Sequence, residues 1–215
     1  MVLIEFRKYT MMLLNTHLEI IENSVKRVWE KLQNCSYYFI TESDFQFELM
    51  RCISEELESS KLLSPTEYNF SWSGKSIRPK LSVILHSEYP RTKKSADRFN
   101  IVLLDDSSMK NDAYHWNEKI ISVAIQLKYG WGLNKAMKDG FLADINKLRD
   151  QISSKRIHYG IAILLATEDI SKEKLKQISE QVEETKSDKI KTYIITPSGI
   201  IPPLTTISPE YLMNN

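Results

Sequence analysis

The sequence predicts an α/β protein with a mixed central sheet flanked by helices. Apolar residues recur at helical spacing in the first third of the chain, and short runs rich in Ile, Val and Leu fill the middle. Beyond Gly132, helical and strand-like segments alternate. A meander of strands followed by a helical crossover gives a mixed sheet with helices on its faces.

Two helices are expected before the first strand. Apolar residues at spacings of three and four predict a helix from Thr10 to about Gln33. A second helix is expected to begin near Ser43, which forms a capping-box pattern with Gln46, and to end by Ser60.

Short strands and two more helices account for most of the remaining chain. Strands are expected over residues 81–86, 99–104, 120–127, 159–166 and 190–196, and helices over 135–153 and 171–186. Prolines at 197, 202 and 203 predict an irregular tail.

Composition indicates a folded, cytoplasmic protein. The 215 residues are 42% hydrophobic with a net charge of +1, which excludes a disordered chain. No apolar run reaches the roughly 18 residues of a membrane span, and the charged start does not resemble a signal peptide. Cys35 and Cys52 are too few for a disulfide framework. We expect a helical extension over 1–40, packed on an α/β domain over 41–215.

Polar residues interrupt two of the predicted strands. Asn100 shares a strand face with Val102 and Leu104, and a buried amide costs free energy unless it is hydrogen-bonded. Gln126 and Lys128 share one face at the end of the next strand. On adjacent antiparallel strands these polar residues would lie together. The alternative is that the second strand simply emerges into solvent there.

The two strands resemble a known nuclease pattern. Residues 98–103, followed by residues 124–130, resemble the PD-(D/E)XK nuclease superfamily, which has the restriction-endonuclease-like fold. In that family an Asp begins one apolar strand and a Glu-x-Lys ends the next. Here Asn100 stands at the Asp position, Gln126 at the Glu position and Lys128 at the lysine position.

The resemblance extends beyond the two strands. A Glu on an earlier helix often completes the family's set, and Glu48 matches it by position. The order of elements over 43–166 is similar to the family's αβββαβ core, with an N-terminal helix added. The helix segment 144–148 is similar as well.

The resemblance implies Mg²⁺- or Mn²⁺-dependent hydrolysis of DNA phosphodiester bonds. Lys128, Gln126, Asn100 and Glu48 are the expected catalytic residues, and water would be activated near Lys128. Asn100, Gln126 and Glu88 are the expected metal ligands. Neutral amides bind Mg²⁺ more weakly than carboxylates do, so metal binding is expected to be weak, or absent in a degenerate site.

A catalytically degenerate relative is the open alternative. Such a protein keeps the fold and acts as a nucleic-acid-binding or protein-interaction module. For an active site, Glu88, Asp97 or Asp144 offers a relocated carboxylate. The alternatives are a turn residue for Glu88 and an ordinary surface role for the two aspartates and the helical Glu48.

Basic residues gather between positions 75 and 98 and suggest a surface for DNA. The expected DNA-binding residues are Lys75, Arg78, Arg91, Lys93, Lys94, Arg98 and Lys135, with Lys138 nearby. The alternative is a solvated hairpin and loop. Trp116, Tyr129 and Trp131 either stack on bases or pack in the core. The family resemblance is compatible with a homodimer or a larger defence or repair assembly, and no membrane partner is expected.

Overall fold

The structure is a computed structural model that describes most of the backbone. The described ranges are 2–34, 39–62, 66–72, 75–82, 85–90, 98–104, 121–184 and 187–201. Side chains are described within 14–34, 39–62, 85–87, 98–104, 121–184 and 187–201.

Two helices open the chain, as the sequence predicts. Helix α1 covers Val2–Asn34 and begins earlier than the predicted start at residue 10. Helix α2 covers Glu42–Ser59, but its N-cap is Thr41 rather than the predicted Ser43. The Asp44 amide donates to the Thr41 side chain at 3.2 Å, and the Asp44 carboxylate accepts from the Thr41 amide at 2.8 Å. The carboxylate of Asp44 also accepts from the Ile40 amide, which favours a helix start at Thr41 over the predicted start at Ser43.

A six-stranded mixed sheet forms the centre of the protein, in the order β3-β4-β5-β6-β7-β8. Strands β3 to β5 are antiparallel neighbours, β5 to β7 run parallel, and β8 returns antiparallel to β7. The strands are β3 (Leu85–Pro90), β4 (Arg98–Leu104), β5 (Ile121–Gly130), β6 (Ile157–Ala166), β7 (Ile190–Thr196) and β8 (Gly199–Ile201). The predicted α/β class with a mixed sheet is therefore confirmed.

Two details of the strand prediction are wrong. The predicted strand over 81–86 is divided between β2 (Lys75–Ser82) and β3. Strand β2 pairs with β1 (Thr66–Trp72) in a separate two-stranded sheet, which the apolar pattern did not predict. The tail expected to be irregular contains β8, because a turn after β7 brings Gly199 back beside Thr196.

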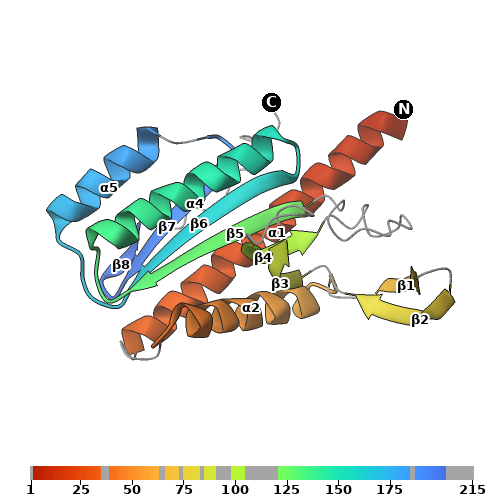
Figure 1. Cartoon of the computed structure of the whole chain (residues 1–215), viewed down its shortest axis with the longest axis horizontal. Coiled ribbons are helices and arrows are strands. Elements are labelled where there is room, and N and C mark those ends of the chain that lie inside the picture. Colours follow the sequence, from red (N-terminus) through yellow and green to blue (C-terminus); the bar gives the residue numbers. More distant parts are fainter. Residues whose placement is uncertain are drawn as a thin grey trace.

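Helices cover both faces of the sheet (Figure 1). Helices α4 (Lys135–Ser153) and α5 (Lys172–Glu184) lie on one face, and α1 and α2 lie on the other. Alternate residues of β5 therefore face different layers. The Lys128 ammonium lies 3.4 Å from Asp144 of α4, whereas the Tyr129 hydroxyl donates to the Phe39 carbonyl, just before α2, at 2.6 Å.

Close packing and a side-chain cap fix α4 on the sheet. The Asn134 side chain caps the helix by accepting from the Met137 amide at 2.9 Å. A Cβ at Gly160 of β6 would lie 3.1 Å from the Leu148 Cβ, so this glycine permits a close approach of helix and strand.

Buried polar contacts hold α1 against the sheet. The Glu22 carboxylate accepts from the Tyr193 hydroxyl at 3.0 Å and forms an ion pair with Lys191 on β7. Burial, and secondarily the negative charge of Glu22, raises the pKa of Tyr193 well above its ordinary value. Nearer the start of α1, the Nδ1 of His17 lies 3.0 Å from the Ser122 hydroxyl of β5. These contacts specify one position of α1 on an otherwise apolar surface.

Within the described ranges, every helix is too short or too polar to cross a membrane.

Candidate functional site

Strands β4 and β5 are joined by side-chain amides at the end that carries Asn100. Main-chain pairing between the two strands runs from Leu104↔Ile121 to Ile101↔Ile125. Next to the last pair, the Oδ1 of Asn100 accepts from the Leu127 amide at 2.9 Å. We call this place the β4–β5 junction.

Gln126 makes a second cross-strand contact at the junction. Its Nε2 donates to the Arg98 carbonyl at 3.1 Å, and the residue is only 5% exposed. An amide serves here because it carries a donor, which an ionised carboxylate lacks. Asn100 and Gln126 are therefore brought together as the sequence predicts, and both have structural hydrogen bonds.

The other side of Asn100 faces the first turns of α2. Its Nδ2 lies 3.5 Å from the Glu42 Oε1 and 3.3 Å from the Gln46 Oε1. The Gln46 Nε2 in turn donates to the Asn100 carbonyl at 3.1 Å. Asn100 thus presents its oxygen to β5 and its N–H groups to α2.

Glu42 connects this amide contact to a charged cluster. Its pKa is raised above the ordinary value, mainly because the carboxylate is partly buried and further because Asp144 is negatively charged. Lys128 and the hydrogen bond from Asn100 oppose the shift. The carboxylate of Glu42 therefore shares the field of both Lys128 and Asp144.

Asp144 lies between two lysines. Its Oδ2 is 3.4 Å from the Lys128 Nζ, and its Oδ1 is 3.1 Å from the Lys147 Nζ. The residue is only 4% exposed. Gly140, one helical turn earlier, makes room for Lys128, since a Cβ at this position would lie 2.9 Å from the Lys128 Cε.

Glu48, the helical acid expected at the site, contacts α1 instead. Its Oε1 lies 2.6 Å from the Arg51 Nη2 and forms an ion pair with Lys31. Burial alone would raise the pKa of Glu48, but the hydrogen bonds from Arg51 and Lys31 lower it to about 2. Glu48 therefore serves a salt bridge between α1 and α2, while Glu42 is the α2 acid that reaches Asn100.

The structure describes Glu88, Asp97 and Asp144 to different extents. The backbone of Glu88 lies between the register pairs Ser87↔Ile101 and Tyr89↔Phe99, and so runs beside Asn100. The side chain of Glu88 and the whole of Asp97 are outside the described residues. Asp144 does contact Lys128, as the relocated-carboxylate hypothesis requires.

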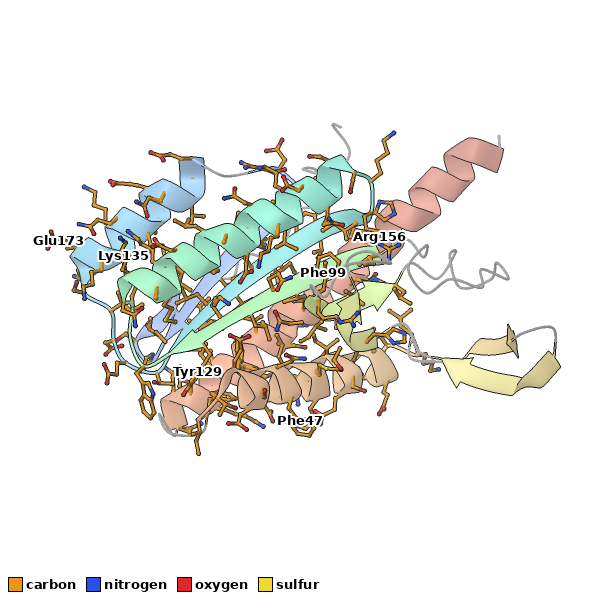
Figure 2. All side chains as sticks on the ribbon, in the orientation of Figure 1. Phe47, Phe99, Tyr129, Lys135, Arg156 and Glu173 are labelled. Carbon is orange, nitrogen blue, oxygen red and sulfur yellow. The ribbon has the colours of Figure 1, made fainter. Side chains whose placement is uncertain are left out.

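The expected DNA-binding residues are only partly described. Arg98 and Lys135 are exposed, at the start of β4 and of α4. In Figure 2, Lys135 and Tyr129 lie at the same end of the sheet. Lys75 and Arg78 belong to β2, where only the backbone is described. Arg91, Lys93 and Lys94 lie outside the described residues.

The candidate aromatic residues differ in exposure. Trp131 is 51% exposed, and its carbonyl accepts from the Glu168 amide at 2.8 Å, which ties the loop after β5 to the loop after β6. The ring of Tyr129 is partly buried against the segment before α2. Trp116 is outside the described residues.

Of the side chains that the structure describes, those around the β4–β5 junction do not form a Mg²⁺ site. The described carboxylates near Lys128 are those of Glu42 and Asp144, and two lysines already compensate the charge of Asp144. The oxygen of Asn100 already accepts a main-chain hydrogen bond. Among the described side chains, no group of three or more His, Cys, Asp or Glu residues is placed to hold a metal ion. Mg²⁺ favours several oxygen ligands with negative charge.

The sequence pattern did not reveal Glu42, Gln46 or Gly140. An acid in the first turn of a helix is expected from the helix dipole alone, so Glu42 carried no distinct signal. Gly140 inside a predicted helix was the one available sign, because glycine lowers helix stability unless close packing requires it.

Comparison with protein-family models, with curated proteins and with solved structures finds no match to this chain.

Proposed function

We propose that this chain is a PD-(D/E)XK-like protein that binds nucleic acid and does not hydrolyse it. The observation that carries the proposal is the double amide at the β4–β5 junction. Asn100 donates toward Glu42 and Gln46, and Gln126 donates to the Arg98 carbonyl. Carboxylates at these two positions could not donate any of these bonds.

The charge balance beside Glu42 supports the same reading. In a metal-dependent nuclease, neighbouring acids need a cation between them. Here an amide N–H of Asn100 faces the Glu42 carboxylate, and the Lys128 ammonium contributes positive charge. The junction is therefore compensated by groups of the chain itself, which argues for a degenerate site that retains the fold.

Nucleic acid is the proposed partner because the domain exposes cations, one of them, Arg98, beside the junction. Arg98 and Lys135 are exposed at the ends of β4 and α4, and the stretch between 75 and 98 adds further basic residues. Phosphate contacts of this kind give binding that weakens steeply with salt. A cytoplasmic location, and a homodimer or larger defence or repair assembly, belong to the same proposal.

Metal-dependent hydrolysis of DNA is the second candidate, and the acids around Lys128 favour it. Glu42 and Asp144 are carboxylates in the field of the lysine that the family resemblance marks as catalytic. A relocated metal site would have to use them. The present donor set does not fit such a site, so no catalytic step is derived from it.

One experiment separates the two candidates. Purified protein is incubated with supercoiled and linear DNA in Mg²⁺ and then in Mn²⁺, beside Lys128→Ala, and DNA binding is measured at several salt concentrations. We expect salt-sensitive binding and no cleavage. Cleavage that disappears in Lys128→Ala would establish the hydrolase instead, and cleavage that persists in the variant indicates a contaminant. Failure to bind DNA or RNA at low salt would overturn the proposal.

A further inference from the structure

The hairpin of β1 and β2 is a structural unit without an assigned role. In the part of the chain that the structure describes, it forms a two-stranded sheet separate from the six-stranded sheet. Figure 1 shows it extending away from the six-stranded sheet, beyond the end of α2. An isolated two-stranded hairpin is marginally stable in water, so a bound partner would stabilise it.

The register of the hairpin places aromatic and basic residues on one face. Residues directly opposite each other on antiparallel strands share a face, and so do alternate residues of one strand. The opposed pairs are Trp72↔Lys75, Phe70↔Ile77 and Tyr68↔Lys80. One face therefore carries three aromatic positions along β1, with lysine positions opposite the first and the last of them.

A bulge in β2 leaves this arrangement intact. The register shifts between Tyr68 and Phe70, where the single residue Asn69 of β1 is opposite both Arg78 and Pro79 of β2. The extra residue belongs to β2, so the alternation along β1 is unbroken. Proline, which cannot donate to the ladder, is typically found at such a bulge.

The composition of this face fits a single-stranded nucleic acid. Aromatic positions at alternate residues repeat about every 7 Å along a strand. Unstacked bases can stack on such positions whatever their sequence, while lysines contact the phosphates. A duplex hides the faces of its bases inside the stack and can use only the lysines.

We infer that the β1–β2 hairpin is an arm that binds single-stranded nucleic acid, with Tyr68, Phe70 and Trp72 as a stacking platform and Lys75 and Lys80 as phosphate contacts. The inference rests on the proposed nucleic-acid-binding function and adds the form of the ligand. Nothing in this face favours one base over another, so binding without sequence preference is expected.

The test compares a single-stranded oligonucleotide with the matching duplex by fluorescence anisotropy. The full-length variant Phe70→Ala with Trp72→Ala should weaken single-strand binding by about 30-fold or more, because each of the two lost base stacks is worth about 1–3 kcal/mol. Duplex binding should change by less than about twofold, because phosphate contacts are unaffected.

Matched controls separate stacking from folding. Phe70→Tyr with Trp72→Phe keeps aromatic rings and should preserve the affinity for single strands. Ser71→Ala with Ser76→Ala changes an opposed pair on the other face and should also have no effect. Circular dichroism and thermal melting of each variant check that the fold is retained.

The outcomes distinguish this inference from the proposed function. If the aromatic-to-alanine variant binds single strands as tightly as the unmodified protein, the stacking arm is wrong and the nucleic-acid-binding function stands. An equal loss for single strand and duplex, or a loss in the aromatic control, would also overturn the stacking role. If the unmodified protein binds neither ligand, both the proposed function and the arm fail.

Discussion

Replacing Asn100 by aspartate tests the structure of the β4–β5 junction directly. The new carboxylate keeps one oxygen for the Leu127 amide, because that contact needs only an acceptor. Its second oxygen replaces an N–H that faces Glu42 at 3.5 Å and Gln46 at 3.3 Å. Two acceptors then lose a donor, and two carboxylates lie side by side.

Two energy terms set the expected loss of stability, an unsatisfied hydrogen-bonding group and the repulsion between two carboxylates. An unsatisfied buried polar group costs about 1–3 kcal/mol. Two unit charges 3.5 Å apart repel by about 5 kcal/mol at an effective dielectric constant of about 20. The pair avoids part of this repulsion by taking up a proton, which the raised pKa of Glu42 favours. We expect Asn100→Asp to lower the free energy of unfolding by roughly 2–4 kcal/mol at neutral pH.

The loss should depend on pH with a definite sign. The paired carboxyls in the folded state have a higher pKa than in the unfolded chain, so the folded state binds the proton more tightly. The deficit is therefore smaller at about pH 5 than at neutral pH. Urea denaturation at both pH values, followed by circular dichroism, measures it.

A double variant provides the matched control. Glu42→Gln in the Asn100→Asp background replaces the second carboxylate by an amide, which can donate to the first. It should recover most of the lost stability and remove the pH dependence. Asn100→Asp as stable as the unmodified protein at neutral pH would refute the hydrogen bonding assigned to this junction.

A second double variant tests whether carboxylates at the junction would bind a metal ion. Asn100→Asp together with Gln126→Glu adds two carboxylates at the β4–β5 junction, one of them facing Glu42, and carboxylate oxygens are the ligands that Mg²⁺ prefers. Mg²⁺ should raise the thermal midpoint of this double variant and leave that of the unmodified protein unchanged. A Mg²⁺-dependent rise in the thermal midpoint of the unmodified protein would contradict the degenerate site, and cleavage of DNA by the double variant alone would support it.

Three further predictions concern the surroundings of the junction. The pKa of Glu48 is lowered from 4.5 to about 2, so ionised Glu48 contributes roughly 3 kcal/mol to the free energy of unfolding above pH 4.5, and this contribution is lost as pH falls toward 2. In Glu48→Gln the free energy of unfolding should therefore fall less between pH 4.5 and pH 2, as measured by urea denaturation. Gly140→Ala should stabilise α4 by up to about 1 kcal/mol in urea denaturation, because alanine favours the helix and the end of the Lys128 side chain can shift away from the new Cβ; a loss of stability would show that the contact of Lys128 with Asp144 is worth more than the gain in helix propensity. Tyr193→Phe removes the hydroxyl that donates to Glu22 and should cost roughly 2 kcal/mol, measured by thermal melting at neutral pH.

Local sequence determined most of the secondary structure. The predicted helix over 135–153 has the observed bounds of α4, because its apolar spacing and the Asn134 cap are local signals. The hairpin of β1 and β2 was missed because the expected strands were assigned from continuous apolar runs, whereas in β1 the signal is the alternation of Tyr68, Phe70 and Trp72 with polar residues. The cap of α2 was misplaced because Thr41 with Asp44 and Ser43 with Gln46 both have the form of a capping box.

Part of the candidate site was also readable from the chain. Asn100, Gln126 and Lys128 interrupt apolar strands, and a polar residue inside such a strand must find a partner. The structure supplies those partners, and it brings Asn100 and Gln126 to the same junction. The identity of each hydrogen-bonding or ion-pair partner could not be predicted, because it depends on the register of β4 against β5 and on the helix that covers each face of the sheet.

Tertiary structure alone decided which acids reach the junction. Glu42 and Glu48 are both acids on α2, and helical geometry turns one toward β4 and the other toward α1. Asp144 reaches Lys128 only because α4 packs on the face of β5 that carries the lysine and Gly140 leaves room for it. The sequence thus determined the chemical groups and the strands that hold them. The packing of helices on a twisted sheet, which involves contacts between residues far apart in the chain, decided which of those groups meet.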